Sequence, residues 1–170
     1  MSKEDFWAII ENSKSVLSET ERDGNLENQV EVIRESLMKL DKNGIIEFEK
    51  LFHEFSQNLY TWELWGAAYV MAGGCSDDSF SDFRSWIISL GRDAYELALV
   101  SPDDLGPLSK EPTVEDFFFE ELSYVASEVY EELFDDELDI DLPYLPDPKG
   151  KEWDEDEVDN LYPKLAKIYS

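Results

Sequence analysis

Residues 73–86 place two glycines, a cysteine, three aspartates and an arginine within a short stretch of sequence. Gly73 and Gly74 bring the backbone close to the start of an expected helix, whose free amides can bind an anion. Cys75 lies directly before that start, where the pKa of a thiol can be lowered and the thiol made reactive. The candidate binding residues around this stretch are Trp62, Trp65, Cys75, Asp77, Asp78, Asp82, Arg84 and Trp86.

The same stretch also has a purely structural interpretation, which is the simpler of the two. The glycines end one helix, Ser76 caps the next, and two aspartates in its first turn complement the helix dipole. Cysteine catalysis also needs a base, usually a histidine. The single histidine, His53, lies among phenylalanines on another expected helix, where we interpret it as an ordinary flanking residue. No catalytic residue is therefore assigned.

Arg84 is the residue of this stretch with the most specific expected role. On a helix that begins near Ser76, Asp77 and Arg84 are seven residues apart and share a face. Arginine can grip a carboxylate through two parallel hydrogen bonds, so we expect Arg84, Asp77 and Asp78 to be partly buried together. The alternative is that Arg84 projects into solvent.

The sequence predicts no metal site and no cofactor. Residues 39–50 superficially resemble a calcium-binding EF-hand loop, but placing Gly44 at the required glycine puts Lys39 and Lys50 at ligand positions. One cysteine and one histidine cannot form a zinc site of Cys and His ligands. No phosphate loop, dinucleotide fingerprint or hydrolase elbow is present. Catalysis by a pair of carboxylates stays open, because 41 acidic residues can form such a pair in almost any fold.

Charge is the main compositional anomaly. The chain has 41 Asp and Glu against 14 Lys and Arg, a net charge of −27, and residues 111–159 alone carry 20 acids and 2 lysines. Such a field repels phosphate backbones and anionic lipids, so we expect neither direct nucleic-acid binding nor membrane binding. A basic protein partner, or solubility alone, accounts for the charge.

The compartment predicted from the sequence is the cytoplasm. A single cysteine rules out an intramolecular disulfide and suits a reducing compartment. The first residues lack a basic region followed by a long apolar run, so we expect no signal peptide. No apolar stretch approaches the roughly 20 residues that a membrane span needs.

Apolar residues recur at three- and four-residue steps along most of the chain, which predicts an all-α fold. We expect one compact domain over residues 1–170 with six to eight helices. Lys42, Asn43 and Gly44 are expected to end the second helix, and Thr113 to cap a helix that runs to Phe134. Residues 135–157 are acidic and contain three prolines, so we expect extended chain there. A last helix is expected over residues 156–169, with Pro163 either limiting it or lying in its first turn.

Several motifs together resemble a bacterial family, the domain-of-unknown-function 4240 (DUF4240) family. They are FW at residues 6–7, WELWGAAY at 62–69, GGCSDDSFSDFRSWII at 73–88, DLPY at 141–144, WDED at 153–156 and YPKL at 162–165. The resemblance spans nearly the whole chain, and its central motif is specific. It implies a bacterial origin and one compact domain, but no activity and no catalytic residues.

We therefore expect a binding or regulatory protein that acts on a basic protein partner, rather than an enzyme. The alternative is an enzyme or small-ligand-binding domain whose site lies at residues 73–84. A further alternative is a mimic of nucleic acid that blocks a basic protein, which needs carboxylates spaced like phosphates on one face.

Overall fold

Helices account for the regular structure of the chain, as the apolar spacing predicts. The computed structural model describes residues 1–110 and 117–169, and in those ranges it has nine α-helices and no strand. The all-α prediction is confirmed. The α-helices are α1 (Lys3–Ser13), α2 (Asn25–Met38), α3 (Lys42–Asn58), α4 (Trp62–Ala72), α5 (Asp77–Ser89), α6 (Arg92–Val100), α7 (Val125–Phe134), α8 (Val158–Leu161) and α9 (Pro163–Tyr169). Short 3-10 turns cover Lys14–Val16, Pro102–Asp104, Gly106–Lys110 and Glu120–Ser123.

The helix ends follow the capping residues in the sequence. The Ser2 side chain accepts a hydrogen bond from the Asp5 amide, and the Asp5 carboxylate bonds the Ser2 amide, which completes a capping box. Gly73 ends α4 with a φ of 70°, a conformation that favours glycine. Ser76 caps α5 by accepting from the Ser79 amide. The caps expected at Gly73 and Ser76 are therefore confirmed.

Three helix boundaries differ from the expectation. The Asp41 side chain accepts from the Gly44 amide at 2.7 Å and caps α3, so residues 42–44 begin that helix instead of ending α2. The helix that carries Phe134 begins at Val125, and its expected cap at residue 113 lies outside the described residues. The last helix is divided at Tyr162, because a residue before a proline is driven out of helical geometry.

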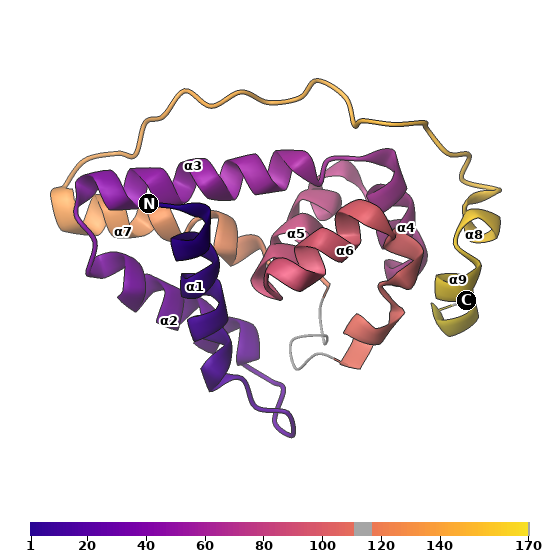
Figure 1. The fold of residues 1–170 in the computed structure, drawn as a ribbon, viewed down its shortest axis with the longest axis horizontal. Helices are drawn as coiled ribbons and strands as arrows, with labels where there is room; N and C mark the ends of the chain where they lie inside the picture. The colour runs from indigo at the N-terminus through magenta and orange to yellow at the C-terminus, as the bar shows by residue number, and fades with distance from the viewer. Residues whose placement is uncertain (111–116, 170) are drawn as a thin grey trace.

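One hydrophobic core joins helices from α1 to α9. Its largest fully buried side chains include Trp86, Phe6, Phe48, Phe80, Phe83 and Phe119. In Figure 1, α3 and α7 run side by side along one edge, α1 and α2 lie beneath them, and α4 to α6 form the other half. α9 packs on α4, where the Tyr162 ring covers Gly66 so closely that a Cβ there would lie 2.6 Å from it. The small residues of α4 thus allow close approach.

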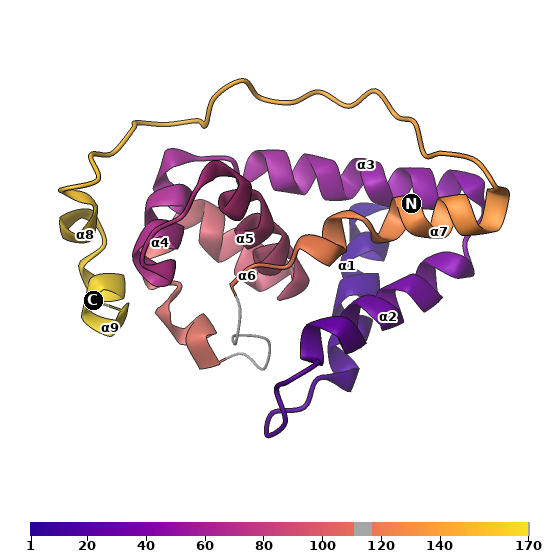
Figure 2. The same cartoon turned by 180° about the vertical axis from the view of Figure 1, so that it is seen from behind.

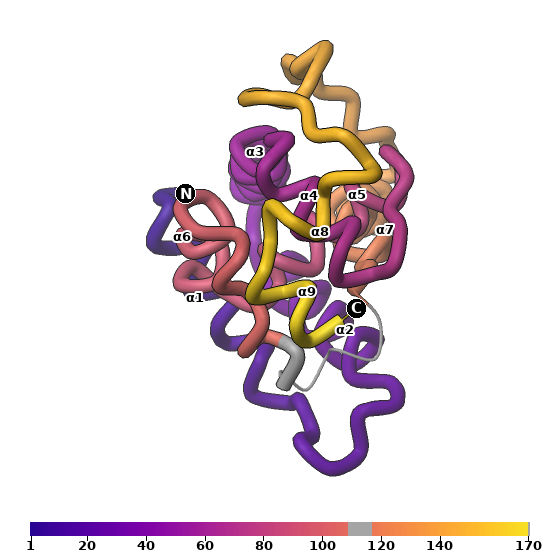
Figure 3. Tube along the Cα trace, turned by 90° about the vertical axis from the view of Figure 1, so that its right-hand side faces the viewer, coloured from indigo at the N-terminus to yellow at the C-terminus, as the bar shows by residue number. Residues whose placement is uncertain are grey.

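The predicted extended segment forms a strap, which we define as residues 135–157. It leaves the end of α7, passes over α3 and reaches α8 at the opposite end of the molecule (Figures 1, 2 and 3). Its anchors are hydrogen bonds to α3 and to the start of α4. They run from His53 Nε2 to the Pro143 carbonyl at 2.5 Å, from the Leu145 amide to Gln57 Oε1 at 2.8 Å, from the Lys149 amide to the Tyr60 carbonyl at 3.0 Å, from the Trp62 amide to the Lys149 carbonyl at 2.9 Å and from Trp153 Nε1 to the Trp62 carbonyl at 2.7 Å.

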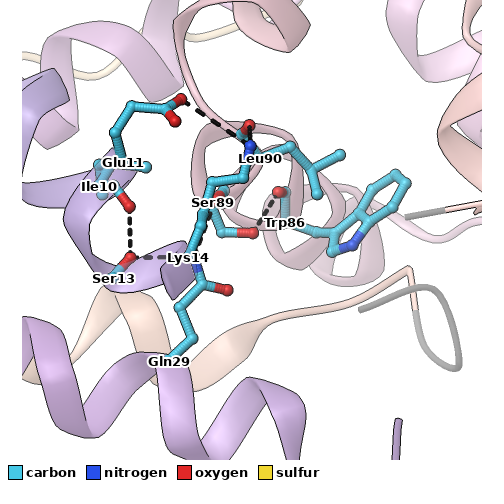
Figure 4. A network of polar contacts seen from close by, with 8 residues as sticks. All are labelled: Ile10, Glu11, Ser13, Lys14, Gln29, Trp86, Ser89 and Leu90. Carbon is cyan, nitrogen blue, oxygen red and sulfur yellow. Dashed lines mark hydrogen bonds and ion pairs between the residues drawn. The ribbon is translucent and has the colours of Figure 1, made fainter. Parts of the chain in front are cut away.

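A buried polar contact joins α1, α2 and the end of α5 (Figure 4). Gln29 is fully buried, and its Nε2 donates to the Ser89 carbonyl at 2.8 Å and to Ser13 Oγ at 3.1 Å. Lys14 Nζ donates to the adjacent Leu90 carbonyl at 2.8 Å. Carbonyls at a helix C-terminus have no partner within the helix, so these side chains cap α5.

Candidate functional site

A groove of about 560 Å³ lies between α3 and α5. One wall is the face of α3 that carries Glu49 and Ser56, which are seven residues apart and so share a face, together with Tyr60 just beyond the end of the helix. The first two turns of α5 form the other wall. Residues 123–124 and strap residues 144–146 complete the lining.

Arg84 contributes a buried guanidinium to this groove. Its exposed fraction is 6%, and its central carbon lies 4.5 Å from the Tyr60 ring centre and 4.9 Å from that of Phe80. Its Nη1 donates to the Ser56 carbonyl at 3.0 Å and its Nε to the Phe80 carbonyl at 3.4 Å. Burial lowers the pKa of Arg84 to about 10, so the side chain stays positively charged at neutral pH.

The position of Ser56 explains how a buried cation is accommodated. Ser56 lies in the last turn of α3, and the Tyr60 amide, which would bond its carbonyl in a continuing helix, bonds Gln57 instead. Arg84 therefore caps the C-terminus of α3. The helix dipole places about half a negative charge at that end.

The expected cluster of Arg84, Asp77 and Asp78 is only partly correct. Arg84 is buried as expected, but both aspartates are exposed, and no carboxylate of the described residues lies within 4.0 Å of the guanidinium. Asp77 instead accepts from the Tyr60 hydroxyl at 3.1 Å. The reason is the direction of α5, whose first turn lies at the surface while Arg84, two turns later, lies inside.

Three hydrogen-bond donors at the groove have no partner among the described residues. They are Nη2 of Arg84 and the hydroxyls of Ser56 and Ser81, all of which belong to residues that line the groove. Ser81 lies one turn before Arg84 on α5, so the two share a face. The groove thus combines a buried positive charge with unused neutral donors.

Acidic side chains lie around the same groove. Asp77 and Asp78 are exposed at its α5 side, while Glu49 is half-buried on α3. Burial raises the pKa of Glu49 to about 7, well above its ordinary value of 4.5. Burial and the hydrogen bond to Asp77 raise the pKa of the Tyr60 hydroxyl.

The candidate tryptophans lie beside the groove and do not line it. Trp62 stacks on Trp65 with ring centres 5.1 Å apart, Trp65 stacks on Phe80 at 5.3 Å, and Trp153 of the strap packs edge-on against both tryptophans. Trp65 Nε1 donates to the Cys75 carbonyl at 2.9 Å. Trp86 is fully buried in the core. These rings join α4, α5 and the strap.

The surroundings of Cys75 do not favour a reactive thiol. Burial, followed by the negative charge of Asp82, raises the pKa of this half-buried thiol to about 12, so almost no thiolate exists at neutral pH. Asp82 borders a different groove, which residues 22–27 and 118–121 also line, and its carbonyl accepts from the Phe119 amide at 3.0 Å.

The candidate set omitted the α3 wall of the groove. Glu49, Ser56 and Tyr60 carry no motif, and the one signal is that Glu49 and Ser56 form a polar stripe beside the apolar stripe of α3. His53, expected to be an ordinary flanking residue, anchors the strap through Pro143.

Metal-binding side-chain groups and membrane-spanning helices are both absent from residues 1–110 and 117–169. In those ranges no group of three or more His, Cys, Asp or Glu side chains is placed to hold a metal ion. A helix both long and apolar enough to cross a membrane is also absent from the described chain.

By its fold and its groove, the chain is a helical protein with a polar groove in which one arginine is buried. The chain belongs to the DUF4240 family of proteins of unknown function, whose model matches residues 1–132. The resemblance noted in the sequence is confirmed over that range. No curated protein and no solved structure matches the chain. The strap and helices α8 and α9 follow the matched residues.

Proposed function

We propose that the chain is a binding or regulatory protein that docks a basic protein partner on the acids of its strap. The observation that carries the proposal is the lack of neutralisation in this region. The ion pairs within the described chain involve Glu11, Glu31, Glu47, Glu54, Glu96, Asp104 and Glu128. None involves an acid between residues 131 and 159.

The strap also holds its acids on an anchored backbone. Residues 135, 136, 137, 139 and 141 are exposed acids outside the helices, and the nearby residues 143 and 145 are hydrogen bonded to His53 and Gln57. A segment that is already ordered loses less conformational entropy on binding than a free acidic tail does. A concentrated negative field also accelerates encounter with a basic surface.

The test compares two variants that each lose five negative charges. In the strap variant, Asp135, Asp136, Asp139 and Asp141 become Asn and Glu137 becomes Gln. In the control variant, five exposed glutamates outside the ion pairs become Gln. They are Glu4, Glu19, Glu21, Glu27 and Glu35.

Binding of a labelled oligolysine peptide, which stands for the basic surface, is measured at low salt by fluorescence anisotropy. We expect the strap variant to bind about tenfold more weakly than the parent and the control to change by less than about twofold. Equal losses in the two variants would show that only net charge matters and would overturn the proposal.

A further inference from the structure

Arg84 is the starting point for a second kind of binding site. A buried charge is normally paired with an opposite charge, because its desolvation is costly. Arg84 has 6% exposure, yet among the described residues its guanidinium has no carboxylate within 4.0 Å. This is unusual in a chain with 41 acidic residues, three of which, Glu49, Asp77 and Asp78, line the same groove.

The structural role of Arg84 uses only part of the side chain. Nη1 caps the Ser56 carbonyl and Nε bonds the Phe80 carbonyl, while the α3 dipole offsets about half of the charge. Nη2 is not a fully enclosed atom, and Arg84 lines the groove, so Nη2 meets solvent there. A guanidinium edge with free N–H groups fits a carboxylate.

The neighbours of Arg84 favour the same ligand group. The hydroxyls of Ser56 and Ser81 line the groove and have no hydrogen-bond partner among residues 1–110 and 117–169. Both can donate to the oxygens of a bound carboxylate. The Tyr60 and Phe80 rings beside the guanidinium limit its motion, which lowers the entropy cost of binding.

The acids of the groove decide what else the ligand carries. Asp77 and Asp78 at the α5 side, and Glu49 on α3, would repel a ligand that is only an anion. They would attract an ammonium group attached to the same carboxylate. A volume of about 560 Å³ is in the range of small-molecule sites.

We propose that the groove between α3 and α5 binds a small zwitterion of the amino-acid type, with its carboxylate on Arg84 and its ammonium group toward the acids. This site uses none of the strap acids that carry the proposed function. The proposed ligand of the groove is a small molecule, and the proposed ligand of the strap is a protein. The two proposals can therefore fail separately.

The first experiment is isothermal titration calorimetry of the full chain at about pH 8, where Glu49 is ionised. The probes are the standard amino acids, each alone, with acetate as a carboxylate alone and methylamine as an ammonium alone. We expect at least one amino acid to bind with a Kd below about 1 mM and both single-charge probes to bind at least about tenfold more weakly. Absence of amino-acid binding, or acetate binding of equal strength, would overturn the proposal.

Variants then locate the site. Arg84→Lys keeps the charge but loses the planar set of N–H donors of the guanidinium. We expect it to weaken binding of the tightest-binding amino acid about tenfold or more. Because Arg84 is buried, Ser81→Ala and Asp77→Asn give independent tests at less buried positions, each with an expected loss of about three- to tenfold. Their controls are Ser127→Ala and Asp93→Asn, which lie on α7 and α6.

The variant series shows whether the amino acid binds in the groove. Losses in the groove variants with unchanged controls support the site. Undiminished binding in Ser81→Ala and Asp77→Asn would place the amino acid elsewhere and overturn the assignment. The five-acid strap variant should bind the amino acid as the parent does, and a tenfold loss there would contradict a site confined to the groove.

Discussion

Two buried side chains donate hydrogen bonds to carbonyls at helix C-termini, which have no partner within their own helix. Gln29 of α2 caps the C-terminus of α5 through the Ser89 carbonyl, and Arg84 of α5 caps the C-terminus of α3 through the Ser56 carbonyl. Each side chain comes from a different helix than the one that it caps. The two contacts therefore join α2, α5 and α3 in series.

The two caps differ in charge and in access to solvent. Gln29 is neutral and fully buried, and its Oε1 is enclosed without a hydrogen-bond partner among the described residues. Arg84 is charged, has unused donors and borders a groove. The two buried polar residues therefore differ in how much of their bonding capacity faces accessible space.

The largest expected effect on stability is that of Arg84→Ala. The substitution removes a charged hydrogen bond to Ser56 and contacts with two aromatic rings, and it leaves a cavity. Relief of the desolvation cost offsets part of this, so we expect a loss of about 2–4 kcal/mol in the free energy of unfolding, measured with denaturant.

Arg84→Met is the matched control, because methionine keeps most of the apolar stem and removes the charge. We expect it to lose roughly half as much as Arg84→Ala. A loss below about 1 kcal/mol for Arg84→Ala would show that the cap on α3 contributes little to stability. It would contradict the expectation that the Arg84 cap contributes more than the Gln29 cap.

Gln29→Ala is expected to have a smaller effect. It removes two neutral hydrogen bonds, to Ser89 and Ser13, but it also removes the unpartnered Oε1. We expect a loss of about 2 kcal/mol, and a smaller one for Gln29→Leu, which refills the space. A loss for Gln29→Ala greater than that for Arg84→Ala would show that the Gln29 cap contributes more to stability than the Arg84 cap does.

A further expected effect depends on pH and belongs to the groove. The pKa of Glu49 is about 7 in the folded state against an ordinary 4.5, so the folded state binds the proton more tightly. The contribution of Glu49 to stability is therefore greatest below pH 4.5 and is lost as the pH rises through about 7. Glu49→Gln removes this dependence and should stabilise the chain by about 1–3 kcal/mol at about pH 8.

The measurement is denaturant unfolding across that pH range, with Glu35→Gln as the control for loss of one negative charge. Glu35 is exposed, so we expect its variant to follow the pH profile of the parent. A gain in Glu49→Gln that is as large below pH 4.5 as above pH 7 would contradict the assignment of the penalty to burial of the ionised carboxylate.

The sequence predicted the helices and their caps because these depend on nearby residues. Ser76 and Gly73 act as expected, since each interacts with residues a few positions away. The exception is the turn after α2, where Asp41 caps α3 although residues 42–44 were expected to end the preceding helix.

The groove was less predictable because its walls are distant in the sequence. The contact between Arg84 and Ser56 joins residues 28 positions apart, and that between His53 and Pro143 joins residues 90 positions apart. The burial of Arg84 followed from the aromatic residues around it. The exposure of Asp77 and Asp78 did not, because it depends on the direction in which α5 enters the core.

The packing of Tyr162 on Gly66 has a consequence for the order of folding. Gly66 is buried beneath a ring that is synthesised 96 residues later, which takes roughly 5–20 s on the ribosome. Until then, the position on α4 that the ring covers stays open. The residues matched by the family model, 1–132, end before Tyr162, so that stretch alone lacks the side chain that covers Gly66. The packing around Gly66 is therefore completed only after the C-terminal helices have been made.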